Sequence, residues 1–390
     1  MPCTVSGVVE KRREFVADFV SGDWTMSELC EHYGISRPTG YKWVERYAEH
    51  GDEGLVELSR APVNCPHHTA TTTEELVILL KKTHGWGARK ILRQLRSRLA
   101  PANLPCRSTV FDILKRHGLV MPRRRRTRWQ HPGAAPLRTD APNQVWTIDF
   151  KGQFRTRDGL YCYPLTVMDH FSRYLLCCRA LHDVKTAGAR ATLERLFREC
   201  GLPDAIRSDN GVPFASTGIH GLCELNVWWM KLAIVHQRIT PASPQENGAH
   251  ERMHRTMKDK TTHPPAANLR GQQWKLDDFQ TEYNVERPHE ALDDETPASL
   301  WVPSLRPYPA RLAPPDYPGH FEVRRVSNAG EFIINGCHRF LSQALNGESI
   351  GLEAIDDGLW NIIYYTTLLG RLDERTGKVT GASYRSEKCK

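Results

Sequence analysis

A Pro-rich stretch at residues 129–142, WQHPGAAPLRTDAP, separates two parts of the chain that differ in hydrophobic periodicity. Before it, apolar residues recur at the three- and four-residue spacing of amphipathic helices. After it, short apolar runs indicate strands that alternate with helices. A chain of 390 residues with this change of period is too long to be one small binding module. We therefore expect a multidomain protein, helical at its N-terminus and mixed α/β behind.

Residues 1–60 are predicted to form a first helix-turn-helix domain. Thr25 and Glu28 have the spacing of a capping box, Gly34 supplies a tight turn, and Ser36 caps the helix that follows. In such a domain the second helix of the pair enters the major groove of DNA. The apolar side of that helix is expected to contain Tyr41, Val44, Tyr47 and Ala48. Four of its residues are left as candidates for DNA contact: Arg37, Thr39, Lys42 and Arg46.

The same pattern returns in residues 61–122, which we predict to form a second helix-turn-helix domain. Thr72 and Glu75 again have the spacing of a capping box, Gly87 precedes a basic helix, and Ser108 caps a last helix that ends at Gly118. The residues expected to contact DNA here are Arg89, Lys90, Arg93 and Arg107. Each unit taken alone could equally be a three-helix bundle that touches no nucleic acid, because amphipathic helices with basic faces are common.

The net charge of +8 is confined to the first third of the chain. Residues 1–140 contain 23 Lys and Arg against 15 Asp and Glu, whereas the remainder contains 30 of each kind. Residues 123–142 form a basic and Pro-rich linker that opens with Arg123, Arg124, Arg125, Arg126 and Arg128. These arginines can be a solvated linker or can settle on phosphates when DNA is bound. The two tandem units and this linker together carry the whole surplus of positive charge, which favours DNA binding.

The part after residue 142 predicts a mixed sheet covered by helices, the core domain, at residues 143–301. Strands are expected at residues 145–150, 161–168, 174–180, 205–208 and 234–239. Helices are expected at residues 185–200, 223–231, 249–260 and 274–286. A second Pro-rich linker follows at residues 302–318. Short strand candidates then predict a small all-β barrel at residues 319–376, with a tail at residues 377–390.

Three acidic residues of the core are candidates for a catalytic or metal-binding role. Asp149 ends the first core strand and Asp209 follows the fourth, and each taken alone could be a turn residue. Glu251, Arg255 and Lys258 share one helical face, which could form a surface ion pair. The functional alternative is a Mg²⁺ ligand backed by two phosphate-binding cations, since Mg²⁺ takes oxygen ligands. A fourth acid, Asp169, is interpreted as a turn residue.

Five sequence blocks together carry a family resemblance: TIDFKG, VMDHFSRY, IRSDNGVPFAS, ITPASPQENGAHERMHRTMK and YNVERPHEALDDETPASLW. They resemble bacterial insertion-sequence transposases of the DDE type, which have a retroviral-integrase-like catalytic core. The resemblance implies a ribonuclease-H-like fold. It also implies that Asp149, Asp209 and Glu251 are both the catalytic triad and the metal ligands. This family usually has about thirty-five residues between the second Asp and the Glu. Here Glu251 leaves 41 and Glu246 would leave 36, but Glu251 follows the Pro-Gln-x-Asn-Gly run as the family's Glu does.

The resemblance further implies two Mg²⁺ ions, with Mn²⁺ as a substitute, and a reaction of DNA cleavage followed by strand transfer. It implies terminal inverted repeats and target DNA as partners, and a homo-oligomer, a dimer or larger, on DNA. A catalytically inactive DNA-binding regulator and a nuclease with the same core are the alternatives. Eleven scattered cysteines with no Cys-x-x-Cys pair favour reduced thiols over a disulfide framework or a zinc site around Cys65, His67 and His68. With no signal peptide or membrane span expected, we predict a cytoplasmic, DNA-associated protein.

Overall fold

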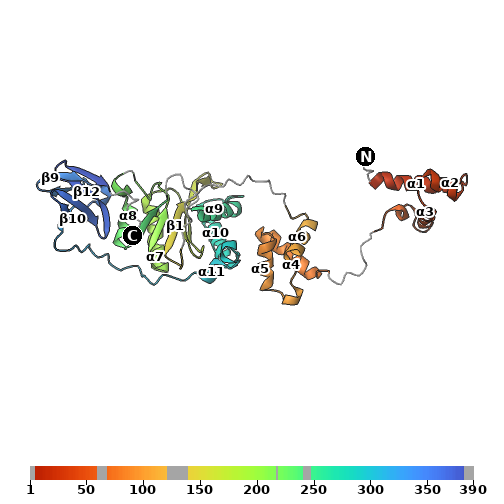
Figure 1. Ribbon diagram of the computed structural model, residues 1–390, viewed down its shortest axis with the longest axis horizontal. Helices are drawn as coiled ribbons and strands as arrows, with labels where there is room; N and C mark the ends of the chain where they lie inside the picture. The colour runs from red at the N-terminus through yellow and green to blue at the C-terminus, as the bar shows by residue number, and fades with distance from the viewer. Residues whose placement is uncertain (1–4, 59–67, 121–138, 217, 240–246, 382–390) are drawn as a thin grey trace. The chain divides into compact units, whose positions relative to one another are not determined.

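The structure is a computed structural model that describes residues 5–58, 68–120, 139–216, 218–239 and 247–381 (Figure 1). By its internal contacts the chain divides into two units, Met1–Ala70 and Thr71–Lys390. None of the described helices is long and apolar enough to cross a membrane. The eight cysteines in the described ranges are all free, which agrees with the expectation of reduced thiols. Cys65 and His67 lie outside the described residues.

The first unit consists of three helices, α1 (Val5–Ser21), α2 (Met26–His32) and α3 (Arg37–His50), and a short 3-10 turn at Gly51–Leu55. The predicted capping box opens α2: the Thr25 side chain accepts from the backbone of Glu28, whose carboxylate accepts from the backbone N–H of Thr25. Gly34 has a φ of 63° in the turn between α2 and α3. This positive φ is one that Gly adopts without steric cost.

The predicted apolar side of α3 is confirmed only for Val44, which packs against the apolar cluster of the first unit. Tyr41 and Tyr47 are exposed, and the residues that α3 buries are Gly40 and Trp43. A Cβ on Gly40 would lie 2.7 Å from the Cys30 Sγ, so Gly lets α3 approach α2 closely. The large Trp43 ring then fills the space that the sequence pattern had assigned to two tyrosines.

The second helical module contains α4 (Thr71–His84), α5 (Ala88–Arg96) and α6 (Arg107–Arg116), packed around Val77, Ile91, Leu95, Val110 and Ile113. Two predicted caps are wrong, because each helix begins two residues earlier than expected. Thr72 lies inside the first turn of α4, and Ser108 lies inside α6, whose N-cap is Cys106. Gly118, with a φ of 66°, follows the end of α6 as predicted.

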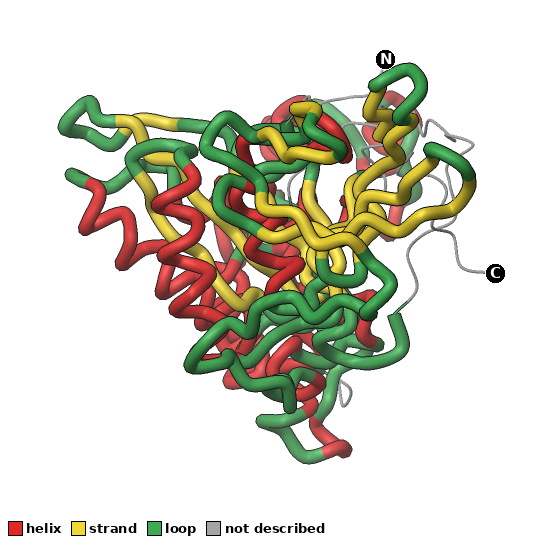
Figure 2. Tube along the Cα trace, turned by 90° about the vertical axis from the view of Figure 1, so that its left-hand side faces the viewer, coloured by secondary structure: helices red, strands yellow, loops and turns green. Residues whose placement is uncertain are grey.

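The mixed sheet of the core has six strands. Figure 2 shows the strands of the chain in yellow, with helices in red beside them. They are β1 (Val145–Phe150), β2 (Phe154–Arg155), β3 (Tyr161–Asp169), β4 (Leu175–Leu181), β5 (Ala205–Ser208) and β6 (Val235–Arg238). The order is β2-β3-β1-β5-β6, with β4 also paired to β3. The β1, β3 and β4 strands pair antiparallel, whereas β1, β5 and β6 pair parallel. This confirms the predicted mixed sheet and adds the short β2.

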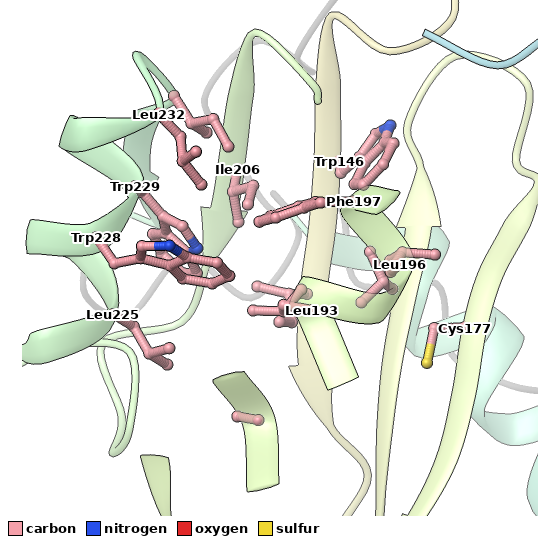
Figure 3. Close-up of a cluster of buried hydrophobic side chains, with 14 of the residues drawn as sticks. Trp146, Cys177, Leu193, Leu196, Phe197, Ile206, Leu225, Trp228, Trp229 and Leu232 are labelled. Atoms are coloured by element: carbon pink, nitrogen blue, oxygen red, sulfur yellow. The ribbon is translucent and has the colours of Figure 1, made fainter. Parts of the chain in front are cut away.

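Helices pack against the sheet in two separate apolar clusters. One cluster joins α7 (Thr186–Cys200) and α8 (Glu224–Lys231) to the sheet. In it Trp146 and Ile148 of β1 pack with Phe197, Trp228 and Trp229 (Figure 3). The other joins α9 (Gly248–Thr261) and α10 (Leu269–Thr281) to β3 and β4. Because side chains alternate along a strand, Thr147 and Asp149 of β1 point to the opposite face from Trp146 and Ile148.

Two short elements follow α10. A π-helical turn at Glu282–Glu286 continues it, and the brief helix α11 (Pro297–Leu300) ends the core. The predicted linker that comes next packs along the core. The Arg306 guanidinium donates to the backbone carbonyls of Pro203, Leu232 and Ala233 at 2.7–3.0 Å.

The C-terminal region is all-β, as predicted, but the described strands form two open sheets and no closed barrel. Its strands are β7 (Glu322–Arg325), β8 (Glu331–Ile334), β9 (Cys337–Phe340), β10 (Ser349–Asp356), β11 (Leu359–Tyr364), β12 (Thr367–Asp373) and β13 (Lys378–Gly381). Five form a sheet in the order β13-β12-β11-β10-β7, and β8 and β9 form a hairpin. The strand β13 lies within the predicted tail. Val227 and Met230 of α8 belong to the apolar cluster of this region, which therefore packs directly on the core.

Candidate active site

The topology of the sheet brings Asp149 and Asp209 to the same edge. In the parallel pair of β1 and β5, Val145 lies opposite Ala205 and Thr147 opposite Arg207. Continuing that register by two residues puts Asp149 level with Asp209, which directly follows β5. Neighbouring strands lie about 4.8 Å apart, so the two acids stand side by side. The carboxyl ends of parallel strands are where sheets of this kind bind ligands.

The Asp-Asn-Gly turn after β5 fixes the carboxylate of Asp209. The backbone N–H of Gly211 donates to the Asp209 Oδ1 at 3.2 Å. The side chain of Asn210 donates to the Ile239 carbonyl at 2.8 Å, which ties the turn to the end of β6. A Cβ on Gly211 would lie 2.9 Å from the Asp209 Oδ2. Gly211 is therefore the residue that leaves room for the Asp209 carboxylate.

If Asp209 has the catalytic role that the resemblance implies, Gly211→Ala should reduce DNA strand transfer by about 10- to 100-fold, because a displacement of about 1 Å at a reacting group can cost that much. The added methyl group would push the Asp209 carboxylate aside, while the backbone of Gly211 needs no positive φ. The thermal unfolding midpoint should change little. Gly152→Ala is the matched control, since a Cβ there meets no atom within 4 Å. Equal activities of the two variants would contradict this role of Gly211.

Asp149 lies in an electrostatic environment that opposes its ionisation. Its side chain is 22% exposed. Burial raises its pKa to about 7, helped by the negative charges of Asp209 and, more weakly, Glu251. The backbone N–H of Phe150 and the charge of Lys151 act in the opposite direction. The three predicted acids are therefore close enough for their charges to interact.

A divalent cation would relieve this repulsion, and carboxylate oxygens are the ligands that Mg²⁺ prefers. The donor set formed by Asp149, Asp209 and Glu251 thus fits a Mg²⁺ ion in its chemistry. In the described parts of the chain, however, no three His, Cys, Asp or Glu side chains are already gathered closely enough to hold an ion. The carboxylates would have to draw together when a cation binds.

The raised pKa of Asp149 predicts how stability depends on pH without metal. An unfolded Asp has a pKa of about 3.9, against about 7 in the fold. Between these values the folded protein holds more protons than the unfolded chain, so stability rises as the pH falls from 8 to 5. In EDTA, the thermal unfolding midpoint should rise less for Asp149→Asn than for the wild type as the pH falls from 8 to 5. At pH 8 the variant should be more stable than the wild type. Parallel pH profiles would contradict the raised pKa.

The helix α9 carries Glu251, Arg255 and Lys258 with all three side chains exposed. Within the described residues no ion pair forms between Glu251 and Arg255 or Lys258, so the alternative of a simple surface ion pair is not what the structure contains. The three side chains remain available to ligands in solution. Glu246, the alternative third acid, lies outside the described residues.

Asp169 is buried at the end of β3 and is already fully engaged. Its carboxylate accepts hydrogen bonds from the backbone of Asn143 at 2.8 Å, the backbone of Ser172 at 2.8 Å and the Ser172 hydroxyl at 2.6 Å. These bonds hold the turn between β3 and β4 and anchor the start of β1. The interpretation of Asp169 as a turn residue agrees with this.

The predicted DNA-contacting residues of the first unit lie on α3. Arg37 and Lys42 are exposed, whereas Thr39 and Arg46 are half-buried. The cationic groups of Lys42 and Arg46 lie 4.5 Å and 5.3 Å from the centre of the Trp43 ring. The cationic groups of Lys42 and Arg46 therefore both lie within cation–π distance of the Trp43 ring.

Two of the predicted cations in the second module are paired with acids of the core. Arg89 contacts Asp294 at 2.8 Å and Glu290 at 2.7 Å, and Arg93 contacts Glu295 at 2.6 Å. The other two predicted residues differ. Burial lowers the pKa of Lys90 to about 8, whereas Arg107 is exposed at the start of α6. DNA contact by these four residues stays a prediction. Arg123, Arg124, Arg125, Arg126 and Arg128 lie outside the described residues.

Sequence reasoning missed the polar side chains that lie behind Asp149. Thr147 and Thr166 sit in strands β1 and β3, and His250 and His254 flank Glu251 on α9. A signal was available: polar residues interrupt apolar strands, and two histidines stand four residues apart beside the candidate acid. All four side chains are buried.

Comparison with known families agrees with this architecture. The family described as integrase core domain matches residues 139–244, and a second family with the same description matches residues 232–297. Residues 139–297 are therefore similar to integrase core domains. A helix-turn-helix domain family matches residues 11–62, and a homeodomain-like domain family matches residues 39–114. The N-terminal helix-turn-helix prediction and the resemblance to integrase-core proteins are thereby confirmed.

Individual proteins similar to this chain include retroviral and insertion-element proteins. The Gag-Pol polyprotein of avian reticuloendotheliosis virus is 33% identical over 33% of this chain and 11% of the polyprotein. A protein of insertion element IS407 from Burkholderia multivorans is 24% identical over 63% of this chain and 87% of that protein. Among solved structures, a chain of the simian T-cell lymphotropic virus intasome is 18% identical, with a TM-score of 0.38, over 79% of this chain and 99% of that one. The chain therefore spans only a small part of the retroviral polyprotein.

Proposed function

We propose that this protein is the DNA transposase of an insertion sequence, with Asp149, Asp209 and Glu251 as its catalytic and metal-binding triad. The observation that carries the proposal is the register of β1 and β5, which brings Asp149 and Asp209 to one edge of the sheet, against the helix α9 that contains Glu251. Asp149 and Asp209 stand level at one sheet edge, and Asp209 and Glu251 both raise the pKa of Asp149. The match to an integrase core domain and the likeness to an insertion-element protein support it.

The reaction is a phosphoryl transfer in two steps. A water oxygen first attacks a phosphodiester at the end of the element; a P–O bond forms, another breaks, and a 3′ hydroxyl is released. That hydroxyl then attacks a phosphodiester of the target DNA, so one P–O bond again replaces another. Mg²⁺, when bound as a pair of ions by the three carboxylates, would activate the attacking oxygen and stabilise the leaving one, and Mn²⁺ would substitute. Arg255 and Lys258, exposed on the same helix as Glu251, would hold the DNA phosphates in line.

The helical modules would choose the DNA. Helix α3, with Arg37, Thr39, Lys42 and Arg46, is proposed to enter the major groove of the terminal inverted repeats. Arg89, Lys90, Arg93 and Arg107 of the second module, and the arginines at 123–128, would add phosphate contacts. Because two element ends must be joined to one target, a homodimer or larger assembly on DNA is proposed. Such a protein would act in the bacterial cytoplasm, on nucleoid DNA.

One reaction mixture separates this proposal from its alternatives. Purified full-length protein, Mg²⁺, a labelled element end and a target plasmid are incubated together, and the products are resolved on a gel. We expect label joined to the plasmid. Cleavage of the labelled end without joining would instead identify a nuclease. A shift of the labelled DNA with no covalent product would identify a catalytically inactive regulator.

A further inference from the structure

Four buried polar side chains form a cluster between the sheet and α9, directly behind Asp149. This threonine–histidine cluster consists of Thr147, Thr166, His250 and His254, which are 1%, 0%, 0% and 4% exposed. Burying polar groups is costly unless they find hydrogen-bond partners, and an apolar filling would have packed the same space without that requirement. The proposed reaction uses none of the four. Their position next to the candidate acids therefore requires an explanation.

Thr166 is the centre of the cluster. Its hydroxyl oxygen lies 3.0 Å from the backbone carbonyl of Asp149, its register partner across β1 and β3. The same oxygen lies 2.7 Å from the Nε2 of His250 and 2.7 Å from the Nε2 of His254. One hydroxyl thus connects the backbone of Asp149 to two side chains of α9.

A second contact of His250 attaches α9 to β1 as well. The Nδ1 of His250 lies 2.8 Å from the Thr147 hydroxyl oxygen, which itself donates to the Met168 carbonyl at 3.1 Å. The two imidazole rings lie edge to face with their centres 4.7 Å apart. The Nδ1 of His254 lies 3.7 Å from the Asp149 Oδ2. The cluster therefore reaches both the backbone and the carboxylate of Asp149.

Met253 and Met257 of α9 also pack on the sheet, and the Cys178 thiol of β4 donates to the Met257 sulfur at 3.3 Å. Methionine side chains are flexible and adapt to small shifts, so they do not by themselves fix the position of α9 along the sheet. Hydrogen bonds are directional. Because each residue advances a helix by about 100°, a slip of α9 by one residue would break the histidine contacts and turn Glu251 away from Asp149.

We propose that the threonine–histidine cluster positions Glu251 against Asp149, with Thr166 as the group through which His250 and His254 act. The inference rests on the proposed triad, and it assigns these residues to positioning, not to contact with DNA or metal.

The first test compares two variants of Thr166 in the full-length protein without DNA. Thr166→Val removes the hydroxyl and keeps the shape, whereas Thr166→Ser keeps the hydroxyl. Mn²⁺ binding is followed by the electron paramagnetic resonance signal of the free ion. Loss of a group that orients metal ligands typically weakens metal affinity about 10- to 100-fold. We expect that loss for Thr166→Val and an affinity within about threefold of wild type for Thr166→Ser.

The second test uses His254, in case the Val variant does not fold. His254→Gln places an amide near the position of Nε2 and can still bond to Thr166, whereas His254→Leu fills the space without a polar group. We expect Gln to retain Mn²⁺ affinity and Leu to lose it, with similar thermal unfolding midpoints. The concentration of Mg²⁺ that gives half-maximal strand transfer should rise in the same order.

The outcomes separate the two levels of inference. Wild-type Mn²⁺ affinity in both Thr166→Val and His254→Leu would overturn the positioning role and leave the triad intact. Equal losses in His254→Gln and His254→Leu would overturn the role of Thr166 as the connecting group. A wild-type protein that binds Mn²⁺ with the expected variant pattern but joins no DNA would overturn the proposed transposase function alone. A wild-type protein that binds no Mn²⁺ would overturn the metal site and this inference with it.

Discussion

Asp149→Asn and Asp209→Asn should each lower strand transfer by on the order of 10³-fold or more, the scale seen when a reacting group is removed from an active site. Each change removes one negative oxygen ligand while preserving the shape of the side chain. DNA binding should be unchanged, because the helix that we propose to read DNA belongs to a different unit of the chain. The measurements are the plasmid-joining assay and a gel shift with the element end.

The control for this experiment is Asp278→Asn on α10, an exposed acid of the same domain. It removes the same charge from the protein but lies outside the proposed triad. Its strand transfer should match that of the wild type. If Asp149→Asn kept its joining activity while binding DNA normally, the assignment of the metal site to these acids would be wrong.

Glu251→Gln should cause a similarly large loss, on the order of 10³-fold, whereas Glu246→Gln should leave strand transfer close to wild type. The physical reason is the environment of Glu251. It begins an exposed face of α9 shared with Arg255 and Lys258, and its charge acts on Asp149. The two Gln variants are prepared side by side and compared in the joining assay and in Mn²⁺ binding.

Each Glu variant serves as the control for the other, because they are five positions apart and carry the same change. The two candidate residues differ in their spacing from Asp209: 41 residues lie between Asp209 and Glu251, and 36 lie between Asp209 and Glu246. Loss of activity in Glu246→Gln alone would transfer the third catalytic role to that residue. It would also remove the basis for the positioning role of His250 and His254, which flank Glu251.

The sequence was sufficient to predict the order of the main elements. Short apolar runs located β1, β3, β4 and β5 within a residue or two, because each of these strands has buried positions that require apolar side chains. The five motif blocks pointed to an integrase core, which the family match confirmed. The three acids could be named from those blocks, because the motifs place them at strand ends and on a helix.

Other predictions failed where packing between elements decides the outcome. The barrel was predicted from strand-sized segments, but strand pairing depends on tertiary contacts, and the described strands close no barrel. The stretch at 302–318 looked like a linker because it is rich in Pro, yet Arg306 satisfies three backbone carbonyls of the core. The apolar side of α3 was misassigned because Gly40 and Trp43, and not the tyrosines, fit against α2.

By itself the sequence predicted three carboxylates as the reacting groups, at ordered points of a region that resembles an integrase core, behind basic helical modules. Those are properties of residue type and spacing. Only the tertiary structure decided that Asp149 and Asp209 stand level across a parallel strand pair and raise the pKa of Asp149. It alone revealed the buried Thr166 and the two histidines behind them, because contacts across 84 and 88 residues of chain depend on how the sheet and α9 pack.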